Sequence, residues 1–315
     1  MAPQVMLAGE PMGLFIAQEE GPLENVGSYT MAVAGAEFNV AVGLSRLGHS
    51  VGYLSKLGED PFGKRIAHVM EENAISSPWL SYSKERPTGF MLKNRVSQGD
   101  PEIFYFRKNS AASTLSPQDI GAVDFSGCKL VHMTGILPAL SQTARQAAFC
   151  LMKKARESGV LVSFDPNLRP QLWESREVMV QVLNELASQA DFVFPGEAEG
   201  EILMGSRDPK AISEFYLNLG AKTVITKVGS RGAYAATAQR QFMVKGFPVQ
   251  KVVDTVGAGD GFAAGVLSGV LENCDLEECV LRGNAVGAIQ VMSLGDNEGL
   301  PTREQLAAFM GRSEL

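Results

Sequence analysis

The sequence contains little of what disulfide-bonded or zinc-dependent proteins rely on. Of its 315 residues, four are cysteines and three are histidines. No two of the cysteines, which are Cys128, Cys150, Cys274 and Cys279, form a CxxC pair, and no histidine pair encloses a glutamate at the spacing of a zinc-hydrolase helix. These absences argue against a disulfide framework, a zinc knuckle and zinc hydrolysis, and we expect the cysteines to be reduced.

The chain also lacks an excess of positive charge and a long apolar run. Its 28 Lys and Arg residues stand against 35 Asp and Glu residues, a formal net charge of −7. Such a chain would repel a polyphosphate backbone, so a nucleic acid is not expected as a partner. No apolar stretch reaches the roughly 18 residues of a membrane span, and the N-terminal segment has no basic start of a signal peptide. We therefore expect a cytoplasmic protein without a membrane partner.

The chain is rich in glycine, with 33 residues, and its 45% apolar and 20% charged residues are typical of a globular protein. Its length corresponds to about two average domains, although one α/β domain of this size is common. Short apolar runs alternate with helical periods for most of the chain, which predicts βαβ units and a parallel sheet covered by helices on both faces. The predicted strands are Gln4–Ala8, Val51–Lys56, Leu130–Met133, Val160–Phe164, Phe192–Phe194 and Thr223–Thr226, and the predicted helices include Glu37–Leu47, Phe62–Asn73, Thr143–Ser158, Ser175–Ser188 and Ile212–Leu219.

Two stretches, 28–34 and 88–108, interrupt this alternation with β-branched and aromatic residues and no helix between them. They predict extra strands, and Asp100-Pro101 divides the second stretch into a hairpin suited to cover a pocket as a lid. Later in the chain, Gly232–Thr237, Gln241–Lys245 and Gln250–Val253 are predicted as short strands. Helices follow them, at Ala263–Leu271 and Leu281–Val291.

The segment Asp254–Phe262, DTVGAGDGF, is a glycine loop that opens a helix. Gly257, Ala258 and Gly259 would turn backbone N–H groups and the positive end of the helix dipole toward an anion, such as a phosphoryl group in transfer. Asp260 does not suit a phosphate-binding position, but it suits a base that removes a proton from an attacking hydroxyl. The alternative is that Asp260 only caps the helix.

Two other phosphate-binding motifs fail. The segment Gly58–Arg65, GEDPFGKR, has Arg65 where a P-loop needs a hydroxyl for Mg²⁺, and it carries two acidic residues. We interpret it as a structural connection between a strand and a helix. The dinucleotide fingerprint fails because Phe262 stands at the position of its third glycine.

The Asp254–Gly261 run resembles the C-terminal signature of the ribokinase-like (phosphofructokinase B-type) carbohydrate kinases. Ala34–Ala41 with Leu44–Gly48 is similar to the N-terminal signature of this family, and Leu57–Gly63 is similar to the segment after it. The resemblance implies one α/β kinase domain over residues 1–315 with a β-strand lid. It also implies ATP as donor, Mg²⁺ between the phosphates, a primary alcohol of a sugar as acceptor, and Asp260 as catalytic base.

The resemblance further implies a nucleotide site. Its candidate residues are Lys227, Gly229, Ser230 and Gly232, together with Gly257, Gly259 and Asn284. Lys227 has the alternative of a surface charge at a strand end, and Asn284 that of a solvent-facing helix residue.

Three positions bear on metal ions and on the acceptor. The family's Asn-x-x-Glu element appears here as Gly196–Glu199, so Glu199 remains a candidate for an indirect contact with Mg²⁺ although the Asn is missing. Asp254 is a candidate for a loop that binds a monovalent cation, K⁺. Leu14 stands where members that act on neutral sugars carry an Asp that binds hydroxyls.

The acceptor is expected to be anionic. Strand alternation turns Tyr105 and Arg107 to one face, where a guanidinium can bind a carboxylate bidentately. Arg169 follows a predicted parallel strand at its carboxyl end, where α/β proteins bind ligands. The alternatives are an exposed lid residue for Arg107 and a salt bridge to Asp165 for Arg169.

These features are most similar to the 2-keto-3-deoxygluconate kinase subgroup, which phosphorylates the terminal primary hydroxyl to give 2-keto-3-deoxy-6-phosphogluconate. The resemblance implies sugar contacts by Gly35, Asn39, Tyr105, Arg107, Asn167, Arg169, Asp260 and Asp296. A fructokinase or another sugar kinase of the family is the alternative, and a non-catalytic sugar-acid-binding paralogue is a more remote one. We also expect a homo-oligomer, a dimer through the lid strands, because these strands have open edges and phenylalanines.

Overall fold

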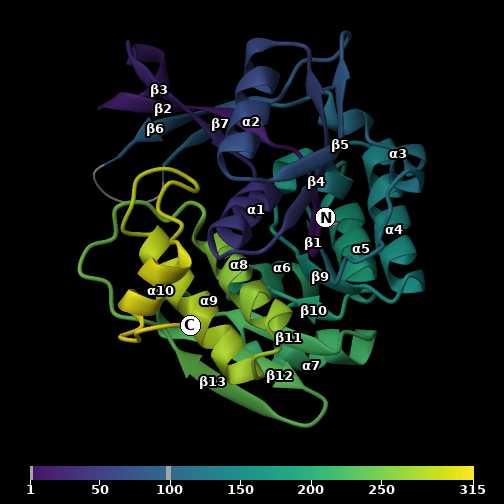
Figure 1. Ribbon diagram of the computed structural model, residues 1–315, viewed down its shortest axis with the longest axis vertical. Helices are drawn as coiled ribbons and strands as arrows, with labels where there is room; N and C mark the ends of the chain where they lie inside the picture. The colour runs from purple at the N-terminus through teal and green to yellow at the C-terminus, as the bar shows by residue number, and fades with distance from the viewer. Residues whose placement is uncertain (1–2, 97–100) are drawn as a thin grey trace.

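The computed structural model, which describes residues 3–96 and 101–315, is built around a large sheet with strand order β13-β12-β11-β10-β9-β8-β1-β4-β5 (Figure 1). All neighbours from β10-β11 through β4-β5 pair in parallel, whereas β12 and β13 are added antiparallel. The strands are β1 Val5–Ala8, β4 Val51–Gly58, β5 Ser76–Ser83, β8 Leu130–Thr134, β9 Leu161–Asp165, β10 Phe192–Val193, β11 Thr223–Lys227, β12 Gly232–Thr237 and β13 Gln241–Lys245.

Helices cover both faces of this sheet, as predicted. Leu7 of β1 belongs to a hydrophobic cluster shared with α1, α2, α8 and α9, and Met6 belongs to a second cluster shared with α3, α4, α5 and α7. Successive residues of a strand point to opposite faces, so the central strands are buried on both sides and read as continuous apolar runs. The helices are α1 Ala36–Arg46, α2 Pro61–Glu72, α3 Pro117–Gly121, α4 Gln142–Glu157, α5 Arg176–Ala187, α6 Glu197–Met204, α7 Pro209–Leu219, α8 Ala258–Leu271, α9 Leu276–Gln290 and α10 Arg303–Phe309.

A second, four-stranded sheet lies at the end of the molecule remote from β13 (Figure 1). Its order is β3-β2-β6-β7, with β2 and β6 parallel and the outer pairs antiparallel. The strands are β2 Met12–Glu20, β3 Tyr29–Ala34, β6 Phe90–Arg95 and β7 Ile103–Phe106. The two predicted lid stretches therefore are strands of one small sheet. Pro101 precedes β7, and Asp100 lies outside the described residues.

Several predicted elements need correction. The strands β2 and β5 were not expected, and Gln250–Val253, predicted as a strand, is a loop. The side chains of Val252 and Val253 are 57% and 45% exposed, so they are not buried as the side chains of an inner strand would be. The helices α8 and α9 begin at Ala258 and Leu276, about one and a half turns before the predicted starts.

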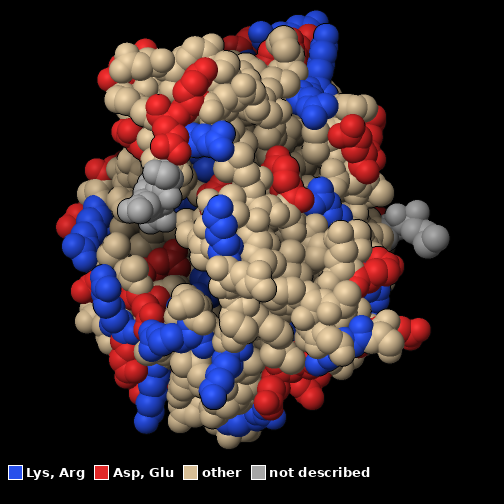
Figure 2. Space-filling model, turned by 90° about the vertical axis from the view of Figure 1, so that its left-hand side faces the viewer, with Lys and Arg blue, Asp and Glu red and all other residues tan. Residues whose placement is uncertain are grey.

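The surface carries both signs of charge. On the face shown in Figure 2, acidic and basic side chains are interspersed, and acidic side chains also lie inside a hollow. Over the described residues, none of the helices combines the length and the apolar character needed to cross a membrane.

Candidate active site

Two adjoining cavities lie beside the first turn of α8. One, of about 710 Å³, is bordered by the β11–β12 turn, the loop after β13, α8 and α9. The other, of about 590 Å³, lies between α8, the loop after β9 and the small sheet. Lys227, Thr255 and Gly259 line both cavities. A chemical group transferred from a ligand in one cavity to a ligand in the other would cross at this shared wall.

The start of α8 has the form of an anion hole. Gly257 is its N-cap residue with φ of 78°, a left-handed conformation, and an added Cβ would lie 2.0 Å from the backbone oxygen of Asp296. Glycine is therefore required there on two grounds. Gly257 and Gly259 line the smaller cavity, which we call the acceptor-side cavity, and Ala258 and Gly259 line the larger one, which we call the donor-side cavity. The N–H groups of a first helical turn have no partners within the helix, and the helix dipole adds positive potential at the same place.

Asp260 faces the acceptor-side cavity from this first turn. Since Gly257 is the cap, the alternative that Asp260 merely caps the helix is wrong. Its Oδ2 accepts a hydrogen bond from Asn39 Nδ2 at 2.7 Å, and its Oδ1 accepts one from Asn167 Nδ2 at 3.4 Å. Shielding from water raises the pKa of Asp260 to about 7, against the opposing effect of the Asn39 hydrogen bond. A carboxyl group with this pKa is suited to exchange a proton near neutral pH.

Lys227 is fixed at the end of β11 by Asp165 at the end of β9. Their Nζ and Oδ2 atoms are 2.5 Å apart, and the Lys227 side chain is 22% exposed. Lys227 is therefore not a surface charge, and an Asp165–Arg169 bridge does not form. Burial disfavours the charged form of the Lys227 amine. The negative charges of Asp165 and Glu199 outweigh this effect and raise the pKa of Lys227. A charged ammonium thus lies where the two cavities meet.

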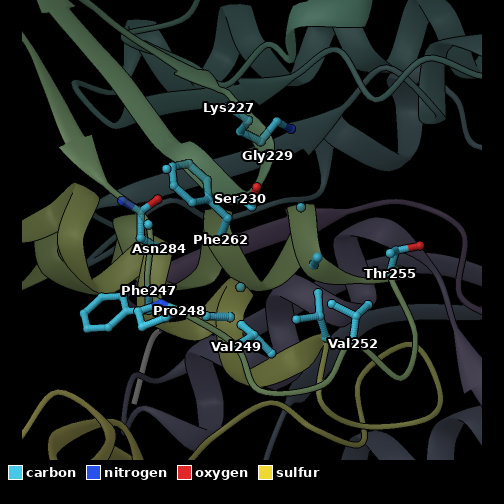
Figure 3. Close-up of a pocket in the computed structure, with 17 residues that line it drawn as sticks. Lys227, Gly229, Ser230, Phe247, Pro248, Val249, Val252, Thr255, Phe262 and Asn284 are labelled. Carbon is cyan, nitrogen blue, oxygen red and sulfur yellow. The ribbon is translucent and has the colours of Figure 1, made fainter.

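The larger cavity combines glycine backbone with an apolar wall (Figure 3). Of the predicted nucleotide residues, six line it, namely Lys227, Gly229, Ser230, Gly232, Gly259 and Asn284, whereas Gly257 lines only the smaller cavity. Phe247, Pro248, Val249 and Val252, which the sequence reasoning missed, line the side opposite Lys227. Their shape suits a flat, largely apolar group such as a nucleobase.

Asn284 is 8% exposed, so the solvent-facing alternative is wrong. Its Nδ2 donates to the backbone oxygens of Val244 and Lys245 at 3.1 and 3.2 Å. The side chain thereby ties α9 to the end of β13, next to the cavity wall.

All eight residues predicted to contact the sugar line the smaller cavity. They come from the loops after β3, β7 and β9, from β7, from α1 and α8, and from the loop after α9, and they are Gly35, Asn39, Tyr105, Arg107, Asn167, Arg169, Asp260 and Asp296. Gly35 has φ of 142°, and an added Cβ would lie 2.7 Å from the Glu10 backbone oxygen. Met12, Met91, Ile103 and Ile136 add apolar contacts that the sequence reasoning did not include.

Arg107 is buried, with 5% exposure, and is not an exposed lid residue. Its Nε lies 2.7 Å and its Nη2 2.5 Å from Oε2 of Glu10, and its guanidinium lies 5.5 Å from the centre of the Tyr105 ring. Glu10 therefore holds the guanidinium in place and offsets part of its charge, a relationship that the sequence reasoning missed. Within the described chain, Oε1 of Glu10 has no hydrogen-bond partner.

Arg169 differs from Arg107 because none of the ion pairs found among the described residues includes it. Its Nη1 donates to the backbone oxygen of Leu168 at 2.8 Å, and the half-buried side chain lines the cavity. The positive charge of Arg169 is thus less compensated by nearby carboxylates than the charge of Arg107. It also opposes the rise in the pKa of Asp260.

The acidic candidates for metal binding are held by the protein itself. Oε2 of Glu199 accepts from Gly196 N–H at 2.7 Å and Oε1 accepts from Leu168 N–H at 2.9 Å, so Glu199 ties the start of α6 to the loop after β9. Asp254 is bound to Lys93. Across residues 3–96 and 101–315, no cluster of three or more His, Cys, Asp or Glu side chains is placed to hold a metal.

The segment that resembled a P-loop has a structural role. Asp60 is the N-cap of α2 and accepts from Gly63 N–H at 2.8 Å and from Thr88 N–H at 2.7 Å. Its carboxylate therefore joins the helix start to the chain entering β6.

A carboxylate in the first turn of a helix, between a cavity with an apolar wall and a polar cavity, is the arrangement expected of a phosphotransferase with an alcohol group as acceptor. The chain belongs to the pfkB family carbohydrate kinases, whose family model matches residues 2–303. The predicted family and fold class are therefore confirmed.

Individual relatives match along nearly the whole chain. A 2-dehydro-3-deoxygluconokinase of Bacillus subtilis is 46% identical over 303 residues, 96% of this chain and 94% of the relative. Fructokinase-2 of Solanum lycopersicum is 30% identical over 313 residues, 96% and 94% of the two chains. The structure of an E. coli protein assigned as ribokinase II, in complex with ATP and Mg²⁺, superposes with a TM-score of 0.90 at 27% identity, covering 98% of this chain and 99% of that one. The chain described here is thus a sugar kinase.

Proposed function

We propose that this kinase transfers the terminal phosphoryl group of ATP to the primary hydroxyl of 2-keto-3-deoxygluconate, giving 2-keto-3-deoxy-6-phosphogluconate. The observation that carries the proposal is the pair of guanidinium groups, Arg107 and Arg169, on one cavity with Asp260. A sugar acid offers a carboxylate to such a cavity, and a neutral sugar does not. The 46% identity with the Bacillus subtilis 2-dehydro-3-deoxygluconokinase supports the same acceptor.

The absence of a carboxylate at position 14 of β2 favours the same assignment. Leu14 is fully buried in the inner cluster of the small sheet and brings no polar group to the cavity. An Asp at this position would add negative charge beneath an anionic acceptor.

In the proposed reaction, Asp260 takes the proton of the acceptor hydroxyl as its oxygen attacks the terminal phosphorus of ATP. The bond from that phosphorus to the bridging oxygen breaks, and ADP leaves with the bond's electron pair. The N–H groups at the start of α8 and the ammonium of Lys227 stabilise the charge that develops on the transferred group. Asn39 and Asn167 orient the carboxylate through their amide groups.

Mg²⁺ fits this site as an ion held mainly by the phosphates of ATP. Mg²⁺ keeps several waters and takes few protein carboxylates, and Glu199 brings a carboxylate to the cavity wall near Lys227. Glu199 would hold the hydrated ion, which when bound supplies positive charge between the phosphates. Both oxygens of Glu199 accept backbone hydrogen bonds, which favours contact through water over direct ligation.

We also propose that residues 1–315 form one kinase domain and that two copies associate through the small sheet. Phe104 and Phe106 of β7 are exposed by 56% and 48%, and Met31 of β3 by 42%. Their neighbours Ile103 and Tyr105 pack on the inner face, so the phenylalanines face outward from an edge strand. Outward aromatic side chains beside an unpaired strand edge favour association.

The acceptor is tested by measuring ADP release with 2-keto-3-deoxygluconate, 2-keto-3-deoxygalactonate, fructose and ribose, against a control without sugar. We expect the highest kcat/KM with one of the two sugar acids. A higher value with fructose would replace the proposal by a fructokinase. Equal background rates with every sugar would favour the non-catalytic sugar-acid-binding paralogue.

A further inference from the structure

A buried lysine lies behind the anion hole. Lys93, on β6 of the small sheet, has a side chain that is 1% exposed. Its Nζ lies 2.6 Å from Oδ2 of Asp254 and 3.1 Å from Oδ1 of Asp296, whose side chains are 2% and 4% exposed. A buried ammonium is stable when it is paired and hydrogen-bonded, and these two carboxylates provide both.

The two aspartates belong to the loops that form the start of α8. Asp254 accepts from Val256 N–H at 3.1 Å through Oδ1 and from Gly295 N–H at 3.2 Å through Oδ2. The backbone oxygen of Asp296 is the atom against which Gly257 packs. The position of the anion hole therefore depends on both loops, and Lys93 joins them.

Without a cation between them, the two buried carboxylates would repel each other and the loops would separate. The family resemblance made Asp254 a candidate for a loop that binds K⁺, and such an ion would take this role. The structure does not fit that ion, because the ammonium already lies between the carboxylate oxygens at hydrogen-bond distances.

We propose that Lys93 is the cation of this loop pair and a positioning residue for the anion hole, so that the enzyme needs no added monovalent cation. A tethered ammonium is present at any salt composition, whereas a free ion must be bound from solution. Because Lys93 lies on β6 beside Met91, which lines the acceptor cavity, it also links the small sheet to the anion hole. The inference rests on the proposed role of the α8 N-terminus in phosphoryl transfer.

The test compares KCl with tetramethylammonium chloride at equal ionic strength, about 100 mM, where exposed charges are largely screened. The proteins are the wild type, Lys93→Met, Lys93→Arg and, as a matched control, Lys84→Met at an exposed position. Phosphoryl transfer and melting temperature are both measured. The melting measurement needs neither sugar nor ATP, so its outcome is separate from that of the proposed acceptor.

We expect the wild type and Lys84→Met to change by less than about twofold between the two salts, since a screened surface responds weakly. In tetramethylammonium chloride, phosphoryl transfer by Lys93→Met is expected to be at least about tenfold slower than by the wild type, because the anion hole loses its support. Added K⁺ should restore part of its activity in a saturable way and should raise its melting temperature more than that of the wild type. Lys93→Arg should remain active without K⁺.

Three results would overturn the inference. One is a wild-type enzyme that needs K⁺ for most of its activity. Another is a folded Lys93→Met variant that loses activity while neither its rate nor its melting temperature responds to K⁺. If Lys93→Met does not fold, a Lys93→Arg variant that needs K⁺ would overturn it, and one that does not would support it.

Discussion

The two cavities beside α8 are built in different ways. The donor-side cavity is lined by glycines, by apolar side chains and, among the described residues, by the single charged side chain of Lys227. The acceptor-side cavity is lined by charged side chains of both signs, carried by strands, loops and helices far apart in the sequence. In the proposed function, backbone and cavity shape bind the nucleotide, whereas side chains bind the acceptor. The names of the relatives differ in the acceptor, since one is named for a sugar acid and another for fructose.

The strongest test of this comparison changes Asp260, which lines the acceptor-side cavity next to the wall that both cavities share. Asp260→Asn removes the proton acceptor but leaves the N–H groups of α8 in place, so turnover should fall by about 10²- to 10⁴-fold. ATP affinity, measured by calorimetry, should remain near that of the wild type because the donor-side cavity is intact.

Asp124→Asn, at an exposed loop position, is the matched control and should leave turnover unchanged. Wild-type turnover in purified Asp260→Asn would remove Asp260 from the role of base.

Specificity should reside in the acceptor-side cavity. Arg107→Met removes a charge-assisted contact worth about 1.5–3 kcal/mol, so kcat/KM for the sugar acid should fall roughly tenfold to more than a hundredfold. Any activity on fructose should change little. The informative quantity is the ratio of kcat/KM for the two substrates, because loss of stability lowers both together.

Since Arg107→Met leaves the Glu10 carboxylate buried without its partner, the double variant Glu10→Gln/Arg107→Met keeps the test valid if the single variant is unstable. Lys108→Met, at the exposed neighbouring position, is the control. A parallel loss with both substrates would assign Arg107 to the structure of the lid.

The pH dependence separates the base from the binding residues. Asp260 acts as a base when ionised, and its pKa is raised to about 7, so kcat/KM should rise with pH through that value. At pH 6 about a tenth of the sites are ionised, so kcat/KM should be about tenfold lower than at pH 8. A profile that is flat from pH 5.5 to about 8 would contradict a base with this pKa.

The smallest effect on turnover is expected at the outer face of the small sheet. Phe104→Lys places a charge among outward aromatic side chains, so it should convert a dimer into monomers in light scattering at micromolar protein concentration. Turnover per chain should change less than in the variants above, because Phe104 does not line either cavity. A monomeric wild type would contradict the proposed dimer.

The sequence predicted the central strands of the large sheet better than the edge of the same sheet. Central strands such as β8 Leu130–Thr134 are apolar throughout, and glycines and helical periods separate them. The strand β5 Ser76–Ser83 is an edge strand with mostly exposed or half-buried residues, so its pattern is weak. Gln250–Val253 shows the opposite error, because its valines lie in a loop and Val252 lines the donor-side cavity. The pattern of apolar residues along the chain reflects burial against a sheet or a helix. It does not predict strands correctly where burial is slight or where apolar residues line a cavity.

What the sequence by itself determined is the set of local requirements: the βα alternation, the glycine at 257, and a carboxylate in the first turn of α8. Each depends on a few consecutive residues, so it can be recognised from their order. Only the tertiary structure decided the partners of the charges. Glu10 with Arg107, Lys93 with Asp254 and Asn39 with Asp260 join positions 97, 161 and 221 residues apart. The energies of such buried pairs depend on distance and desolvation, which the fold sets and the order of residues does not.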